Sequence, residues 1–288
     1  MSRPVRVAAL QTRPVFGDVE GNVRRALAQA DRVAPRAALH VFPELAFSGY
    51  AFVARGEARA LAETPNARRP AEGPGLAALG AWAKARGTWA VAGFPERAGG
   101  GRVFNSAALV GPDGRVHDVY RKIHLFDAEK RWFAPGDRAP RVTRAGALRI
   151  GMLVCYDWRF PEIARVLALA GADLLAHPSN LVVPALAQQA MRVRALENRV
   201  WAVTANRVGA DVRPGVTLGF TGRSQIVDPN GRLVAAAGPR APRALVAAVD
   251  PARARDKRFT ARNDLWRDRR PEFYRPLARP PAGRRGRP

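Results

Sequence analysis

One order of secondary-structure elements occurs twice in this sequence, and this repeat limits the possible folds more than any other feature. The stretch TWAVAGF, followed by NSAALVGPDGRV, is similar to VWAVTANRV, followed by GRSQIVDPNGRL, in the second half. In each half, strand, helix, strand, helix and strand precede a β-hairpin. Each element must bury its apolar face, so we predict an α/β fold with an internal pseudo-two-fold repeat, two sheets packed together and helices outside, in four layers.

Apolar periodicity and turn residues give the expected positions of these elements. Strands are predicted at residues 5–10, 37–44, 88–94, 148–154, 172–179 and 200–208, and helices at 18–33, 75–86, 163–170 and 185–199. Hairpins are predicted at 104–119 and 222–237, with turns at 112–114 and 229–231. No linker-like composition separates the two halves, which favours a single domain. The Arg/Pro-rich residues 275–288 are predicted to be a mobile, solvated tail.

Composition narrows the class of protein. A chain of 288 residues with 47% hydrophobic content has enough apolar side chains for a sizeable core. A single cysteine excludes an internal disulfide framework and a multi-cysteine metal site, and it fits a reducing compartment. The N-terminal apolar run is too short for a signal sequence, and no stretch is long enough to span a membrane. We therefore expect a cytoplasmic protein.

The formal net charge of +24 raises the alternative of a nucleic-acid-binding protein. Only four of the 48 basic residues are lysine, namely Lys84, Lys122, Lys130 and Lys257. The charge is scattered along the chain, which resembles a compositional bias toward arginine. No zinc-finger or RNA-binding signature occurs, and the aromatic residues do not interleave with a basic stripe. Nucleic-acid binding therefore stays the weaker alternative.

The single cysteine occurs in the stretch ALRIGMLVCYDWRFPE at residues 147–162. Cys155 follows a short apolar strand, and Pro161 and Glu162 are typical of the first turn of a helix. At such a corner, free backbone N–H groups and the helix N-terminus favour a thiolate and can hold an oxyanion. A lone cysteine beside an apolar strand can also be an inert core residue, so the interpretation of Cys155 as a nucleophile depends on finding partners for it.

Two further residues at element ends supply such partners. Glu44 ends the second predicted strand and Lys122 follows the first hairpin, and strand ends of a packed α/β fold can meet in one cleft. Thiol attack on an amide or nitrile requires a base, a cation for the developing negative charge and an acid for departing ammonia. We expect Glu44 to move the proton and Lys122 to lower the thiol pKa and hold the oxyanion with the Tyr156 N–H. Glu129 is expected to orient Lys122, with a solvated helix face as its alternative.

These residues lie in motifs that resemble the nitrilase superfamily of carbon–nitrogen hydrolases. The motifs are FPELAFSGY, YRKIHLFDAEKRWFAPGD, CYDWRFPEIARVLALAGADLLAHPSN, RALENRVWAVTANRVG and FTGRSQIVDPNGRL. The resemblance implies a four-layer αββα sandwich over residues 1–274, a Glu–Lys–Cys triad at Glu44, Lys122 and Cys155, and a supporting Glu129. It also implies a homodimer or larger homo-oligomer with a C-terminal arm at 257–274, and neither cofactor nor metal.

The CYDWRFPE form is closer to the amidase-like and archaeal-nitrilase-like branches, which favours a small aliphatic amide of the ω-amide or carbamoyl type, with a nitrile as the alternative. Residues expected near the substrate are Phe47, Tyr50, Trp132, Tyr156, Trp158 and Asn180. Arg159 can bind a substrate carboxylate or pair locally with Glu162, and we expect the local pair. A further alternative makes His124 or His177 the base of a Cys–His dyad.

Overall fold

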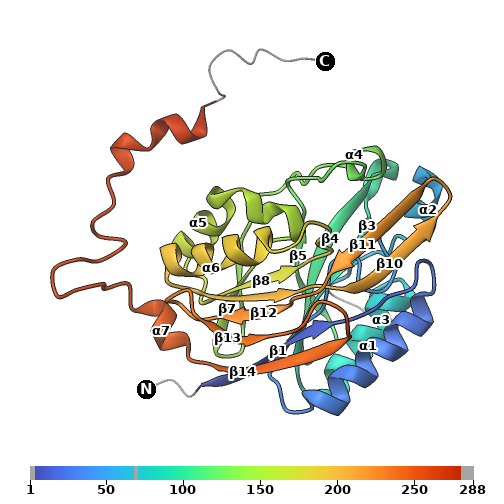
Figure 1. The fold of residues 1–288 in the computed structure, drawn as a ribbon, viewed down its shortest axis with the longest axis horizontal. Coiled ribbons are helices and arrows are strands. Elements are labelled where there is room, and N and C mark those ends of the chain that lie inside the picture. The colour runs from blue at the N-terminus through green and yellow to red at the C-terminus, as the bar shows by residue number, and fades with distance from the viewer. Residues whose placement is uncertain (1–3, 68–70, 280–288) are drawn as a thin grey trace. The chain divides into compact units, whose positions relative to one another are not determined.

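The structure is a computed structural model that describes residues 4–67 and 71–279 (Figure 1). The chain divides into two compact units, Met1–Arg255 and Asp256–Pro288. Most of the predicted tail, residues 280–288, lies outside the described residues, and residues Arg275–Ala278 form a short 3-10 helix. No helix among the described residues combines the length and the apolar character that crossing a bilayer requires.

The first unit contains two six-stranded sheets with the same pattern of strand directions. In the first sheet, three parallel strands (β1, β2 and β3) are flanked by antiparallel β14 on one side and by the antiparallel pair β4 and β5 on the other. In sheet order the strands are β14 (Arg243–Val249), β1 (Val5–Gln11), β2 (Leu39–Val41), β3 (Trp89–Arg97), β4 (Val103–Val110) and β5 (Val116–Arg121).

The second sheet repeats this pattern. Parallel β7, β8 and β9 are flanked by antiparallel β6 and by the antiparallel pair β12 and β13. In sheet order the strands are β13 (Leu233–Ala236), β12 (Gln225–Val227), β9 (Trp201–Ala205), β8 (Leu174–Pro178), β7 (Leu148–Met152) and β6 (Val142–Ala145). The pseudo-two-fold repeat predicted from the sequence is therefore confirmed at the level of topology.

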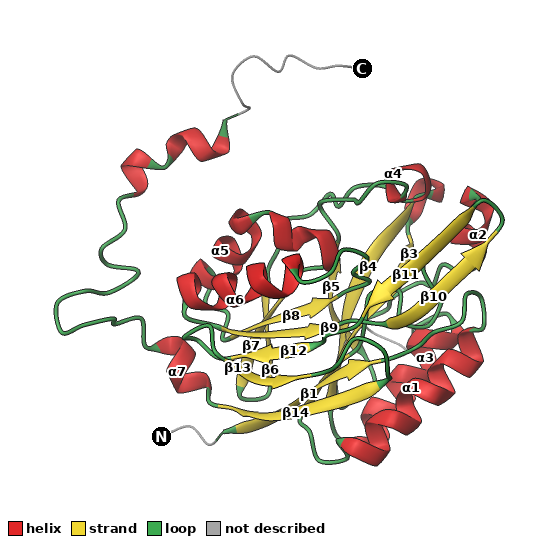
Figure 2. Cartoon of the chain, in the orientation of Figure 1, coloured by secondary structure: helices red, strands yellow, loops and turns green. Residues whose placement is uncertain are grey.

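The core lies between the two sheets and continues on their outer faces. Successive residues of β1 alternate between two cores: Val7 and Ala9 pack between the sheets, whereas Ala8 and Leu10 pack under the outer helices. Both faces of the strand are buried, which explains its uninterrupted apolar sequence. Helices α1 (Val19–Val33) and α3 (Pro74–Arg86) cover the first sheet, and α5 (Pro161–Leu169) and α6 (Leu186–Asn198) cover the second (Figure 2). The four-layer sandwich is confirmed.

The ends of two strands differ from the prediction, and both differences concern the candidate site. Strand β2 ends at Val41, so Glu44 lies in the turn that follows it rather than in the strand, because Pro43 has no N–H to continue the ladder. Strand β7 ends at Met152, and Cys155 begins a 3-10 helix (Cys155–Arg159) that separates the strand from α5. Glu44 and Cys155 thus project from turns just beyond their strands.

Several short elements were not predicted. They are α2 (Arg55–Ala60), α4 (Glu129–Trp132), α7 (Pro251–Arg255), and strands β6, β14, β10 (Val208–Arg213) and β11 (Val216–Thr221). Strands β10 and β11 form a separate hairpin between β9 and β12, and among the described residues this hairpin has no counterpart in the first half. It places second-half residues beside the loop after Glu44, as the contacts below show.

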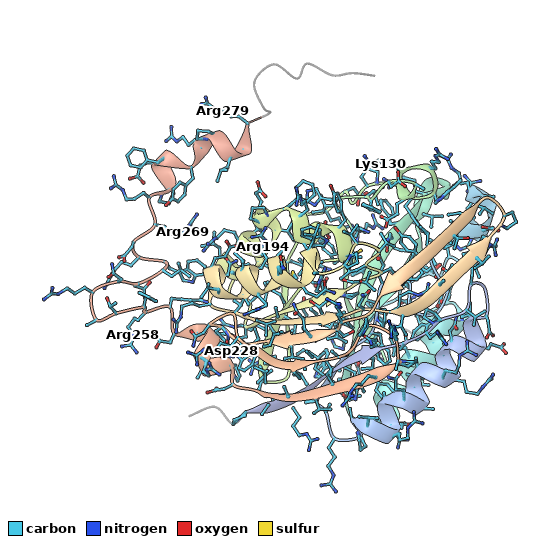
Figure 3. All side chains as sticks on the ribbon, in the orientation of Figure 1. Lys130, Arg194, Asp228, Arg258, Arg269 and Arg279 are labelled. Carbon is cyan, nitrogen blue, oxygen red and sulfur yellow. The ribbon has the colours of Figure 1, made fainter. Side chains whose placement is uncertain are left out.

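Basic side chains are distributed over many elements, as the sequence suggested. Lys130 lies on α4 and Arg194 on α6, while Arg258 and Arg269 belong to the second unit (Figure 3). Within the second unit, some cationic groups lie over aromatic rings; the Arg269 guanidinium, for example, is 5.4 Å from the centroid of the Tyr274 ring.

Candidate active site

Lys122 is the centre of the candidate site. It directly follows β5, and its Nζ lies 2.7 Å from Glu44 Oε1 and 2.7 Å from Glu129 Oε1. Its side chain is fully buried. Burial alone would lower the pKa of Lys122, but the carboxylates of Glu129 and Glu44 outweigh it, and the pKa of this amine is raised. The site therefore holds a permanent ammonium between two carboxylates.

The two carboxylate oxygens of Glu44 have different surroundings. Its Oε1 accepts hydrogen bonds from Lys122 and from Asn105 Nδ2, each at 2.7 Å. Its Oε2 is buried and has no hydrogen-bond partner among the described residues. Gly93 leaves no space beside this turn, because a Cβ there would lie 2.5 Å from Glu44 Cα. Glu44 thus presents one fixed oxygen and one oxygen free to accept a proton.

Asn105 was missed in the sequence analysis although it contacts Glu44 directly. It is fully buried on β4, and its amide fixes Glu44 Oε1 together with the Lys122 ammonium. The signal was present, because an amide in the mostly apolar run VFNSAALV requires a partner when it is buried. A buried polar residue within an apolar strand is therefore a useful indicator of a site.

Glu129 is buried at the first position of α4 and does not lie on a solvated helix face. Its Oε1 accepts from the Tyr50 hydroxyl at 2.7 Å as well as from Lys122, and its Oε2 accepts from the Phe126 N–H at 3.1 Å. Burial raises the pKa of Glu129, while Lys122 and Tyr50 act in the opposite direction. Of the two predicted alternatives, the structure therefore has the contact with Lys122.

Cys155 occupies a strained backbone position. Its φ is 44°, a left-handed conformation that a residue with a side chain adopts only when its surroundings impose it. Asp157, fully buried, supports this turn because its Oδ2 accepts from the Val154 N–H at 2.9 Å and from the Tyr120 hydroxyl at 2.7 Å.

Two backbone N–H groups lie close to the Cys155 turn. The Asn180 backbone N–H acts to lower the pKa of the Cys155 thiol. Among the described residues, no backbone hydrogen bond outside the regular helices and strands uses the Tyr156 N–H. Its role as a donor to an oxyanion stays a prediction.

Lys122 lowers the thiol pKa as expected, but the expectation that a thiolate is favoured is wrong. Burial and the Glu44 carboxylate raise the pKa of Cys155 well above its ordinary value, and Lys122 only partly offsets them. The resting site therefore contains a neutral thiol rather than a thiolate. A nucleophile of this kind needs a base that removes its proton as it reacts, and the unpartnered oxygen of Glu44 has the required character.

The two histidines of the Cys–His alternative contact other groups. The Nε2 of His177 lies 2.9 Å from the Cys155 carbonyl oxygen, and its Nδ1 lies 3.1 Å from Thr204 Oγ1. Burial lowers the pKa of His177 to about 4. His124 stacks on Phe160, and its Nδ1 lies 2.8 Å from an oxygen of the Asp157 carboxylate. Both imidazoles thus support the turn around Cys155.

Cys155 lines a cavity of about 270 Å³. Three of the predicted substrate-binding residues, Tyr156, Trp158 and Asn180, also line it, and both polar side-chain atoms of Asn180 are buried without a hydrogen-bond partner among the described residues. Tyr50 and Trp132 instead line a cavity of about 80 Å³ that also contains Glu129. The two cavities share Phe126 and Val182 in their walls.

The predictions for Phe47 and Arg159 are corrected. Phe47 packs against Phe42 in the outer core beneath α1 and α3, away from the residues that line the cavity. Arg159 forms no ion pair with Glu162 among the described residues. Its guanidinium lies 5.6 Å from the centroid of the Trp158 ring, and Arg159 lines the cavity beside Cys155. Phe160 explains the difference, because its extended backbone between the 3-10 helix and α5 interrupts the helical spacing that a local pair requires.

A sandwich of two six-stranded sheets between helices, with a buried cysteine, lysine and glutamate just beyond strand ends, fits a hydrolase of the four-layer αββα class. The chain belongs to the carbon–nitrogen hydrolase family, whose family model matches residues 6–259. Its relatives and structural neighbours lie in the nitrilase superfamily.

Three comparisons illustrate this membership. A nitrilase from Pyrococcus abyssi is 40% identical over 271 residues, covering 94% of this chain and 99% of the relative. An (R)-stereoselective amidase from Pseudomonas sp. is 38% identical over 224 residues, covering 77% of each. A mutant of the amidase from Nesterenkonia sp. AN1, with the acetamide moiety of fluoroacetamide added covalently at its active-site cysteine, superposes with a TM-score of 0.77 at 28% identity and covers 95% and 96% of the two chains.

Proposed function

We propose that this chain hydrolyses a small aliphatic amide, of the ω-amide or carbamoyl type, to a carboxylic acid and ammonia through a thioester on Cys155. The observation that carries the proposal is that the two carboxylate oxygens of Glu44 differ. Lys122 fixes Oε1, Oε2 is free, and the nearby Cys155 thiol is neutral. An ammonium, a free carboxylate oxygen and a protonated thiol are the groups that acyl transfer from an amide requires.

The reaction follows from these three groups. Glu44 Oε2 takes the thiol proton as Sγ bonds to the carbonyl carbon, and the carbonyl electron pair moves to oxygen. The Lys122 ammonium and the Tyr156 N–H hold this oxyanion. Glu44 then gives the proton to the leaving nitrogen, the C–N bond breaks and ammonia departs. Water, deprotonated by Glu44, attacks the thioester, and the acid leaves as the thiol regains its proton.

A nitrile is the alternative substrate, and the nitrilase relative from Pyrococcus abyssi favours keeping it. Sγ would add to the nitrile carbon while the nitrogen receives the proton, which gives a thioimidate. Addition of water and loss of ammonia then produce the same thioester.

The test of the proposed function is ammonia release from a panel of aliphatic amides, ω-amides, carbamoyl compounds and nitriles, with Cys155→Ala as the control. Release by the wild type alone supports the proposal, and no release by folded wild type from any compound argues against it.

The position of Arg159 favours a substrate that carries a carboxylate at the end remote from its amide. It has no carboxylate partner among the described residues and lines the cavity that contains Cys155. We expect Arg159→Gln to raise KM about fivefold for an ω-amide acid, because a charge-assisted contact is lost at a solvent-exposed position. A neutral amide of equal length should keep its KM, which serves as the internal control. Equal effects on both substrates would contradict this role.

We propose, in addition, that the chain forms a homodimer through α5 and α6, with residues 257–274 as an arm that contacts the partner. Five large apolar residues on these two helices are 44–52% exposed, namely Val166, Leu169, Leu186, Val193 and Leu196. Exposed apolar side chains gathered on two adjacent helices favour association with a second copy.

Val193→Glu tests this interface. It should convert a dimer to a monomer in analytical ultracentrifugation, because an unpaired carboxylate would be buried at the interface. Val212→Glu is the matched control, since Val212 lies on β10 and is 75% exposed. A wild type that sediments as a monomer would contradict the proposal.

A further inference from the structure

A buried ion pair lies outside the candidate triad, at the start of the β10–β11 hairpin. Arg207 donates through Nη1 to Asp211 Oδ2 at 2.9 Å and through Nη2 to Asp211 Oδ1 at 2.8 Å. Arg207 is fully buried and Asp211 is 4% exposed. The Arg207 guanidinium also lies 3.9 Å from the centroid of the Phe220 ring on β11. Burying both charges is costly unless good geometry and further hydrogen bonds compensate for the lost hydration.

The carboxylate of this pair reaches the loop that follows Glu44. Asp211 Oδ2 accepts hydrogen bonds from the backbone N–H groups of Tyr50 and Ala51, each at 3.1 Å. The Tyr50 ring also packs edge-on against Phe220, with a centroid separation of 5.9 Å. A residue from the second half of the chain therefore fixes the backbone of a residue from the first half.

Tyr50 connects this clamp, formed by Arg207, Asp211 and Phe220, to the candidate site. Its hydroxyl donates to Glu129 Oε1 at 2.7 Å, and the same oxygen accepts from Lys122 Nζ at 2.7 Å. Because both backbone attachment and ring packing fix Tyr50, the clamp determines the position of its hydroxyl.

We propose that Arg207 and Asp211 are positioning residues, which hold the Tyr50 hydroxyl on Glu129 and so keep Glu129 ionised beside the Lys122 ammonium. This inference rests on the proposed function and adds a requirement to it: the β10–β11 hairpin is part of the machinery that sets the charge of the site.

The charges around Glu129 indicate what loss of the clamp would do. Burial raises the pKa of Glu129, Lys122 and the Tyr50 hydrogen bond lower it, and the Glu44 carboxylate raises it. Burial raises the pKa of Tyr50 itself, so its hydroxyl stays a donor. Loss of this donor raises the pKa of Glu129 further. Glu129 then takes up a proton at a higher pH, and the acid limb of the activity profile moves to higher pH.

The experiment compares Asp211→Asn, Tyr50→Phe and the double variant. We expect each single variant to lower kcat/KM about 10- to 100-fold, the range for loss of a hydrogen bond to a charged group, and to move the acid limb to higher pH. The double variant should be no worse than the more impaired single one, because both changes remove the same hydrogen bond. Independent, multiplicative losses or an unmoved acid limb would overturn the proposal.

Asp173→Asn is the matched control. Asp173 is fully buried and pairs with Arg149 and Arg255, outside the contacts of Tyr50. It should lose stability without moving the acid limb. If Asp211→Asn fails to fold, Phe220→Leu removes the ring that packs against Tyr50 without changing any charge, and it should move the acid limb in the same direction. An unmoved limb in folded Phe220→Leu and Tyr50→Phe would equally overturn the proposal.

The rate of Cys155 alkylation by iodoacetamide separates this inference from the proposed function. Alkylation requires deprotonation of the thiol but no particular substrate. If folded wild type releases no ammonia from any compound, the proposed function fails, yet the pH profile of alkylation in the same variants still tests the clamp. The profiles of Asp211→Asn and Tyr50→Phe should move together, and that of Asp173→Asn should match the wild type. If the pH profiles of alkylation of all these variants match that of the wild type, the proposed role of the clamp is overturned, whereas the proposed function is not.

Discussion

Glu44→Gln is expected to lower kcat/KM for amide hydrolysis by about 10³-fold, within the range for loss of a general acid–base group. The amide retains the size of the side chain but cannot accept the thiol proton. The raised pKa of Cys155 makes this loss severe, because a neutral thiol depends on its base. Steady-state ammonia release over a range of substrate concentrations measures the change.

Glu63→Gln is the control for this variant. Glu63 is also buried, and its carboxylate accepts from the N–H groups of Gly75 and Leu76 at the start of α3, outside the candidate site. It should keep kcat/KM close to the wild-type value. If Glu44→Gln retained most of its activity, the base would have to be another group, and His124 or His177 would be tested next.

Lys122→Met is expected to lower the free energy of unfolding by about 3–5 kcal/mol at about pH 8, the range for removing one partner of a buried ion pair. Two buried carboxylates, Glu44 and Glu129, would lose the cation that lies 2.7 Å from each. Hydrolysis should also fall to background, because the oxyanion loses its charged partner. Urea unfolding measures the stability, and the exposed Lys84→Met should change it by less than about 0.5 kcal/mol.

The pH dependence of Lys122→Met gives a second readout. Without the ammonium, burial and repulsion by the Glu44 carboxylate raise the pKa of Glu129 in the folded state further above its unfolded value. The folded state then binds more protons, so its stability increases as the pH falls. The difference in free energy of unfolding between Lys122→Met and the wild type should therefore become smaller as the pH falls from about 8 to about 5. A deficit that stays constant over this interval would show that lost packing, and not uncompensated charge, causes the destabilisation.

Local patterns predicted some elements accurately. Helix α6 was expected at 185–199 and forms at Leu186–Asn198, because residues with positive φ, Ala185 and Arg199, bracket it. The hairpin turns at 112–114 and 229–231 also lie where expected, between β4 and β5 and between β12 and β13. By contrast, β14 was missed, since it is stabilised by pairing with β1 at the other end of the first unit, and no local pattern contains that contact.

The sequence by itself determined the repeat, the order of the elements along the chain and the candidate reactive residues, because periodicity and motif spacing are local properties. Only the tertiary structure decided the protonation of the site residues and which of their polar groups lack a partner. The direction of the Cys155 pKa shift, the free oxygen of Glu44 and the unpaired Arg159 depend on burial and on distances between residues far apart in the chain. The contact between Asp211 and Tyr50 joins residues 161 positions apart, and it exists because two halves fold against each other.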